Sequence, residues 1–115
     1  TTGYTNRQIY GSGSSVGSIS AGTAYFYGGE APAVNDTTNT FGNACIYIPN
    51  YTSSNTKSAS VDAVEENNAS TLNTLYLSAG VCTNTAAITS IELFAATGTT
   101  FITGSTFTLY GIKAA

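Results

Sequence analysis

Small or apolar side chains alternate with polar ones through residues 57–65 of this 115-residue sequence. Successive side chains of a β-strand point to opposite faces of a sheet, so a period of two predicts a strand with one covered face. The side chains expected on the covered face are Ala59, Val61 and Ala63, and those expected on the other face are Ser58, Ser60 and Asp62. This segment alone favours a β-rich fold.

The rest of the chain has the composition of strands and turns. Thr and Ser supply 33 of the 115 residues and are poor in helix interiors, whereas the β-branched and aromatic residues suit strands. Further windows predicted as strands are residues 4–10, 16–21, 23–27, 41–48, 71–79, 88–95 and 105–112. We predict one all-β domain over residues 1–115, an antiparallel, jelly-roll-like β-sandwich of seven to eight short strands.

The alternation within these windows also predicts which side chains face the core. The expected core residues are Ile46, Ile48, Val61, Leu75, Leu77, Ile91, Leu93, Phe107 and Leu109. A sandwich of this kind leaves edge strands that must be covered, and the sequence offers few charges to protect them. We therefore expect a neighbouring copy of the chain to cover the edges.

Charged residues make up 8% of the chain, against about 25% in an ordinary soluble domain. The net charge is −3, and the basic residues Arg7, Lys57 and Lys113 are too few to neutralise a run of phosphates, so we expect no nucleic-acid partner. No apolar run approaches about 18 residues, so we expect no membrane insertion. Solubility must come from hydroxyl and amide groups, as in extracellular β proteins and virus particles.

The sequence contains two cysteines, Cys45 and Cys82, and no histidine. Their spacing fits no zinc site, so we predict no metal-binding residues. The acidic run over residues 62–68 lacks the ligand spacing of a calcium loop and is typical of a polar turn. Buried free thiols are the favoured interpretation of the two cysteines, with a disulfide in an oxidising compartment as the alternative.

The sequence also lacks the combinations of residues that catalysis requires. Its serine and cysteine side chains have no histidine base, and we expect Lys57 and Lys113 to be solvated. We expect Asp62 and Glu92 to point to solvent and residues 65–68 to form a turn. We predict that the chain is not an enzyme, with no catalytic residues, no cofactor-binding residues and no cofactor. A glycosidase or esterase that uses Asp62 or Glu92 is the disfavoured alternative.

Three of the eight tyrosines are candidate binding residues. Tyr25 and Tyr27 flank Phe26 and would share one strand face, and Tyr51 lies in the polar, turn-like residues 50–56. Tyrosine suits surfaces where one end of the side chain is buried and the other is wet, such as subunit interfaces and sugar sites. We predict that these tyrosines contact a neighbouring subunit or a glycan, and packing is the favoured interpretation.

Four strings of the sequence match a known pattern in order and spacing. They are residues 7–15 (RQIYGSGSS), 46–51 (IYIPNY), 84–93 (NTAAITSIEL) and 104–112 (GSTFTLYGI), the last being the most specific. Together they resemble a C-terminal module of tailed-bacteriophage virion proteins, of the head-decoration or tail-fibre type. In two respects the chain departs from this pattern. Family members usually have further strands before the first string, and Cys82 stands where a bulky aromatic is more common.

The resemblance implies a jelly-roll-like β-sandwich on the outer surface of a phage particle, with no catalytic residues. It implies other copies of the chain, in a trimer, and other virion proteins as partners, and a host-surface glycan as the alternative ligand. Only six residues precede the first string. We therefore expect a fragment of a longer module, a shortened version, or a chain that borrows a strand from a neighbour.

Overall fold

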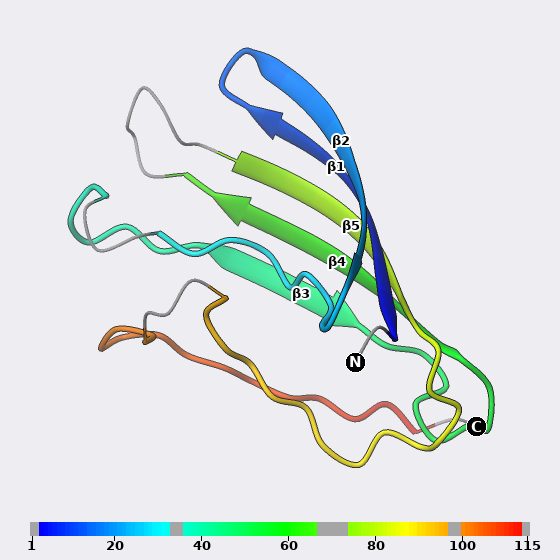
Figure 1. Ribbon diagram of the computed structural model, residues 1–115. Helices are drawn as coiled ribbons and strands as arrows, with labels where there is room; N and C mark the ends of the chain where they lie inside the picture. Colours follow the sequence, from blue (N-terminus) through cyan, green and yellow to red (C-terminus); the bar gives the residue numbers. More distant parts are fainter. Residues whose placement is uncertain (1–2, 33–35, 67–73, 97–99, 114–115) are drawn as a thin grey trace.

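The computed structural model describes residues 3–32, 36–66, 74–96 and 100–113. Over these ranges the chain forms five strands and no helix, so the all-β prediction is confirmed (Figure 1). The strands are β1 (Tyr4–Ser12), β2 (Ser15–Thr23), β3 (Asn43–Tyr47), β4 (Lys57–Glu65) and β5 (Thr74–Cys82). The bounds of β4 are those that its alternation predicted. No helix in the described part of the chain is long and apolar enough to cross a membrane.

All five strands belong to one antiparallel sheet with the order β2-β1-β5-β4-β3. β1 and β2 form a hairpin in which Ser12 pairs with Ser15, leaving Gly13 and Ser14 as the turn. Gly13 has a φ of 56°, in the left-handed region that such tight turns require and that glycine adopts without a steric cost. β2 and β3 are the edges, and β5 lies at the centre.

One face of this sheet, the inner face, contains the apolar core. Ala59, Val61 and Ala63 of β4 are all buried there, as their spacing predicted, and so is Cys82 at the end of β5. Several polar side chains share the face and are also buried, namely Asn6, Gln8, Lys57, Glu65, Thr74 and Ser78. The core is therefore small and largely polar, in contrast to an ordinary domain core.

Residues 24–32, here called the crossing segment, cover the inner face (Figure 1). The Asn6 amide fixes this segment, because its Nδ2 donates to the Tyr25 carbonyl at 3.1 Å and its Oδ1 accepts from the Tyr27 N–H at 3.0 Å. The ring of Phe26 packs edge-on against Tyr4, with centroids 5.0 Å apart. The strand predicted over residues 23–27 is wrong, because a side-chain amide, rather than a neighbouring strand, binds this backbone.

Lys57 occupies the end of the inner face and is only 1% exposed. Its ammonium group donates hydrogen bonds to three carbonyl oxygens, those of Asn55 at 2.6 Å, Thr85 at 3.2 Å and Ala86 at 3.0 Å. The prediction of a solvated Lys57 is therefore wrong. A buried ammonium must find hydrogen-bond partners to replace water, and here the backbone supplies them.

The opposite face of the sheet, the outer face, carries apolar side chains that are exposed. The exposed fraction is 59% for Ile9, 58% for Leu75 and 54% for Leu77, and Val64 and Val81 are also exposed. The prediction that Leu75 and Leu77 face the core is wrong. Both point to the outer face, whereas the crossing segment covers the inner face. Part of their predicted strand, residues 71–73, lies outside the described residues, and β5 continues past the predicted end at residue 79 to Cys82.

Residues 86–96 and 100–113, here called the arm, run beyond β3 in extended form (yellow to red in Figure 1). The strands predicted over residues 88–95 and 105–112 do not form in the single chain. Four expected core residues lie here and are exposed instead, namely Ile91, Leu93, Phe107 and Leu109. The second layer of a sandwich is thus not seen in the described residues, and it remains a prediction.

The strand expected over residues 41–48 is shorter than predicted, because β3 ends at Tyr47, two residues before Pro49. Ile46 is 38% exposed and Ile48 is half-buried, so neither forms part of a closed core. Of the nine expected core residues, Val61 alone is fully buried. Cys82 is a buried free thiol as predicted, but Cys45 of β3 is exposed and free, so its predicted burial is wrong.

Candidate functional site

The outer face is the candidate functional site, and the strand register sets its layout. Ile9 of β1, Leu77 of β5 and Asp62 of β4 lie side by side in one row across the sheet. The neighbouring row toward one end contains Leu75 and Val64. Cross-strand neighbours on one face have Cβ atoms about 5 Å apart, so these apolar side chains form one continuous surface.

Two charged side chains interrupt this apolar surface. Among the described residues of the five strands, Arg7 and Asp62 are the charged ones that point to the outer face. Arg7 donates to the hydroxyl of Ser20 and to the carbonyl of Asn6 through Nη1. Asp62 makes no hydrogen bond or ion pair with any described residue. The outer face thus presents one positive and one negative group, and neither is paired with a group of opposite charge.

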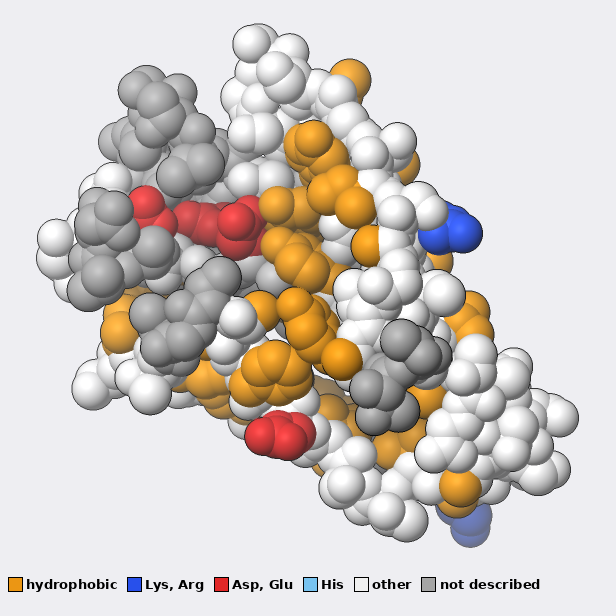
Figure 2. All heavy atoms as spheres, viewed as in Figure 1, with side chains coloured by type: hydrophobic (Ala, Val, Ile, Leu, Met, Phe, Trp, Pro, Cys, Tyr) orange, Lys and Arg blue, Asp and Glu red, His pale blue; other side chains and the backbone are white. Residues whose placement is uncertain are grey.

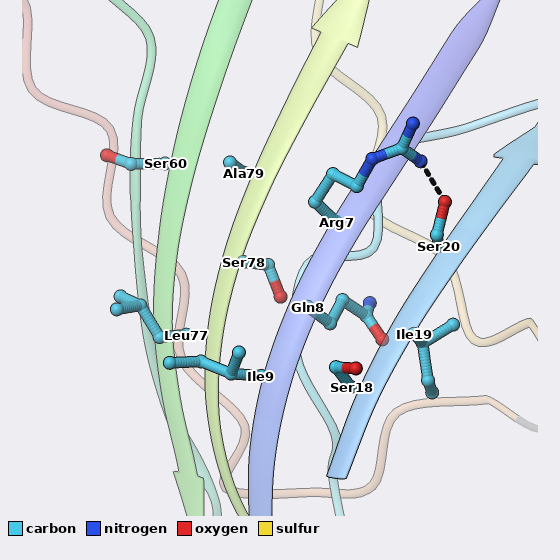
Figure 3. Close-up of a pocket in the computed structure, with 10 residues that line it drawn as sticks. All are labelled: Arg7, Gln8, Ile9, Ser18, Ile19, Ser20, Ser60, Leu77, Ser78 and Ala79. Carbon is cyan, nitrogen blue, oxygen red and sulfur yellow. Dashed lines mark hydrogen bonds between the residues drawn. The ribbon is translucent and has the colours of Figure 1, made fainter.

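A hollow of about 640 Å³ lies in this face (Figure 3). Ile9 and Leu77 form part of its lining, and Ser18, Ser20 and Ser60 lie around them. The view in Figure 2 shows a band of hydrophobic side chains across the middle of the molecule, with acidic side chains beside it. Sequence reasoning missed Ile9 altogether, and the alternation of residues 4–10 was the signal that could have revealed it.

A second, smaller hollow of about 150 Å³ brings two of the candidate tyrosines together. Tyr25 and Tyr27 line it beside the amides of Asn6 and Gln8. The third candidate, Tyr51, is exposed and lines neither hollow, and its carbonyl accepts a hydrogen bond from the Ile88 N–H at 2.9 Å. Tyr25 and Tyr27 thus form one candidate site, and Tyr51 does not belong to it.

The environment of these tyrosines is apolar on one side and acidic on the other. The Tyr27 ring packs against Tyr76, with centroids 5.5 Å apart, and the Tyr76 hydroxyl donates to Glu30 Oε2 at 2.8 Å. Burial raises the pKa of both phenols, and the bond to Glu30 raises that of Tyr76 further. The Tyr25 ring packs edge-on against the ring of Phe94 in the arm, with centroids 5.2 Å apart.

The acidic candidates do not converge. Asp62 lies on the outer face, as expected, and Glu92 is exposed on the arm. Glu65 was expected in a turn, but it is the last residue of β4 and is buried, so that expectation is wrong. Residues 67–68 of the same run lie outside the described residues. In the described part of the chain, no three His, Cys, Asp or Glu side chains cluster closely enough to hold a metal ion.

No protein family, curated protein or solved structure matches this chain. Its function is therefore inferred from its own residues and surfaces.

Proposed function

We propose that this chain is a non-enzymatic structural protein of a bacteriophage particle surface, either a capsid decoration protein or a tail-fibre component. It acts by packing against other copies of itself, in a trimer, and against other virion proteins. The observation that carries this proposal is the continuous apolar surface that the single chain leaves exposed on its outer face.

Apolar side chains exposed together on one face favour an assembly. A soluble monomer rarely exposes an apolar patch larger than a few hundred Å², and larger patches mark interaction surfaces. Here Ile9, Leu75 and Leu77 are more than half exposed on the sheet, and Leu109 of the arm is 81% exposed. Burying such side chains against a neighbour contributes about 25 cal/mol for each Å² removed from water.

The resemblance to phage virion modules supports the same proposal from another direction. Two of its strings, residues 84–93 and 104–112, lie largely within the arm, where many of the apolar side chains are exposed. In the proposed particle the jelly-roll-like sandwich of seven to eight strands is completed when a second layer covers the sheet. A surface with few charges suits a permanent assembly, which has no need to repel its neighbours.

Mass spectrometry of particles purified from the phage that encodes the chain tests this function. We expect the chain to be present in a fixed ratio to the major capsid or tail protein, and immunogold labelling to place it on the particle surface. Its absence from purified particles, while it is made in infected cells, would contradict the proposal.

A carbohydrate-binding adhesion module is the second candidate function, and the small hollow beside Tyr25 and Tyr27 favours it. Aromatic faces and amide groups are the usual means of binding sugars. A glycan array probed with the wild type and with Tyr25→Ala and Tyr27→Ala tests it, with Tyr51→Ala as the matched control. Binding lost in the first two variants and kept in the control would support the adhesin, whereas no binding by the wild type would exclude it for the glycans tested.

A further inference from the structure

The arm leaves the sheet on the side of the inner face, and three contacts fix its origin there. The buried Lys57 ammonium binds the carbonyls of Thr85 and Ala86, at 3.2 Å and 3.0 Å. The Ile88 N–H donates to the Tyr51 carbonyl, and the Phe94 ring packs on Tyr25 of the crossing segment. The arm of a chain would have to break these contacts before it could cover the outer face of its own sheet.

The arm is nevertheless built like a pair of strands. Apolar side chains recur along it, and Phe107, Leu109 and Tyr110 are all more than half exposed. Its described residues make two backbone hydrogen bonds in the single chain, from the Ile88 N–H and from the Ser105 N–H. An extended segment of this kind is stabilised when its apolar side chains pack on an apolar sheet and its two halves pair with each other as strands.

The charges of the arm complement those of the outer face. The charged residues among the described parts of the arm are Glu92 and Lys113. The outer face presents Arg7 and Asp62, likewise one of each sign. Each surface is therefore neutral overall, and a contact that sets Glu92 by Arg7 and Lys113 by Asp62 leaves none of these four charges unpaired.

We propose that the arm of one copy lies on the outer face of a second copy and supplies the missing layer of the sandwich between chains. This inference rests on the proposed function, since it names the surface through which the subunits pack. The two halves of the arm would add two strands over the five of the sheet. Because the two surfaces of the contact differ, it is of the head-to-tail type, which closes into a ring such as a trimer when the rotation between copies allows.

The outer face is large enough for such a contact. Four of its strands have nine residues each. At about 3.3 Å for each residue and about 4.8 Å between strands, the face is about 30 Å long and about 20 Å wide. That is roughly 600 Å² in projection, before the relief of the side chains is added, and a specific interface buries about 800 Å² on each partner.

A mixing experiment with two single variants tests this contact. Leu77→Asp places a charge on the outer face and leaves the arm intact, whereas Leu109→Asp places one on the arm and leaves the face intact. Light scattering should give an oligomer for the wild type and the 11.8 kDa monomer for each variant alone. An equal mixture of the two should give a dimer and nothing larger, because one intact arm then meets one intact face.

Three outcomes would overturn the proposal: a monomeric wild type, variants that stay oligomeric, or a mixture that stays monomeric. A Leu109→Asp variant that stays oligomeric while Leu77→Asp is monomeric would point to a symmetric contact between two outer faces. Circular dichroism checks that each variant is folded, and Leu75→Asp and Phe107→Asp form a second pair should one of the first fail to fold. Thr38→Asp, a change at an exposed residue that belongs to neither surface, is the control and should stay oligomeric.

Different experiments test the arm contact and the proposed function, so either proposal can be wrong while the other stands. If the chain is present in phage particles but the variants do not complement each other, the contact is wrong and the function stands. If complementation succeeds but the chain is absent from particles, the contact stands and the phage function is wrong.

Discussion

The ring of Phe26 lies directly on the backbone of Gly80, at the centre of the inner face. A Cβ atom added to Gly80 would clash with Cδ1 of that ring and would be 2.7 Å from its Cε1. Glycine within a strand often marks such a close approach. The contact holds the crossing segment on the sheet, since Phe26 also packs against Tyr4.

We predict that Gly80→Ala destabilises the protein by about 1–3 kcal/mol, because the ring must move away from a packed position. Urea unfolding followed by far-UV circular dichroism measures this. Gly11→Ala is the matched control, since Gly11 is also in a strand but an added Cβ there meets nothing within 4 Å. Equal stability of the two variants would contradict the predicted role of Phe26.

Lys57→Met should lower the free energy of unfolding by about 1–3 kcal/mol, because three backbone carbonyls lose the donor that they share. The amide hydrogens near residues 85–88 should also exchange faster, since the origin of the arm is released. Lys113→Met removes the same charge from an exposed site and should change stability by less than about 0.5 kcal/mol. Unchanged exchange in the Lys57 variant would show that the arm is held by other contacts.

Tyr76 should make the stability depend on alkaline pH. Burial and the bond to Glu30 raise its pKa above the value of about 10 in an unfolded chain. The folded state then holds the phenol proton more tightly than the unfolded state. This contribution is fully present below pH 10, and the free energy of unfolding falls as the pH rises above it.

Urea unfolding between pH 8 and pH 11 measures this effect, and the expected result is a weaker decline in Tyr76→Phe than in the wild type. Tyr110→Phe alters an exposed phenol and serves as the control. Identical pH dependence in the wild type and the Tyr76 variant would contradict the assignment. Below pH 9 the Tyr76 variant should lose about 1 kcal/mol with its hydrogen bond to Glu30.

Ser78→Ala should stabilise the protein by up to about 1 kcal/mol. The Ser78 hydroxyl is buried on the inner face and has no hydrogen-bond partner among the described residues. Burying a hydroxyl without a hydrogen-bond partner is unfavourable, so its removal should raise the free energy of unfolding. Ser60→Ala, on the exposed face of β4, should have little effect. A loss of stability in the Ser78 variant would indicate that the hydroxyl is hydrogen-bonded in solution.

The sequence predicted strand positions better than it predicted burial. The alternation over residues 57–65 identified β4 and its buried side chains, because Ala59, Val61 and Ala63 differ clearly from the polar residues between them. In β5 the alternation also separated two faces, but it placed the larger side chains, Leu75 and Leu77, inward. Gly80 and Ser78 are the inward ones, since the crossing segment needs room there.

Other features depend on contacts between distant residues, which no local pattern contains. Lys57 is a lysine in an otherwise ordinary strand, and its burial follows from the carbonyls of Thr85 and Ala86. The candidate site was likewise only partly visible in the sequence. Tyr25 and Tyr27 were identified from their spacing, whereas the outer face emerged only when the sheet register placed Ile9 beside Leu77.

The burial of Lys57 gives its amine a chemical behaviour of its own. Reagents that acylate amines need an accessible, unprotonated nitrogen, and this nitrogen is enclosed and already donates to three carbonyl oxygens. Lys113, by contrast, is exposed. Of the two lysines, Lys57 can react only while the origin of the arm is open. The rate at which Lys57 is acylated therefore measures how often the origin of the arm detaches from the sheet of its own chain.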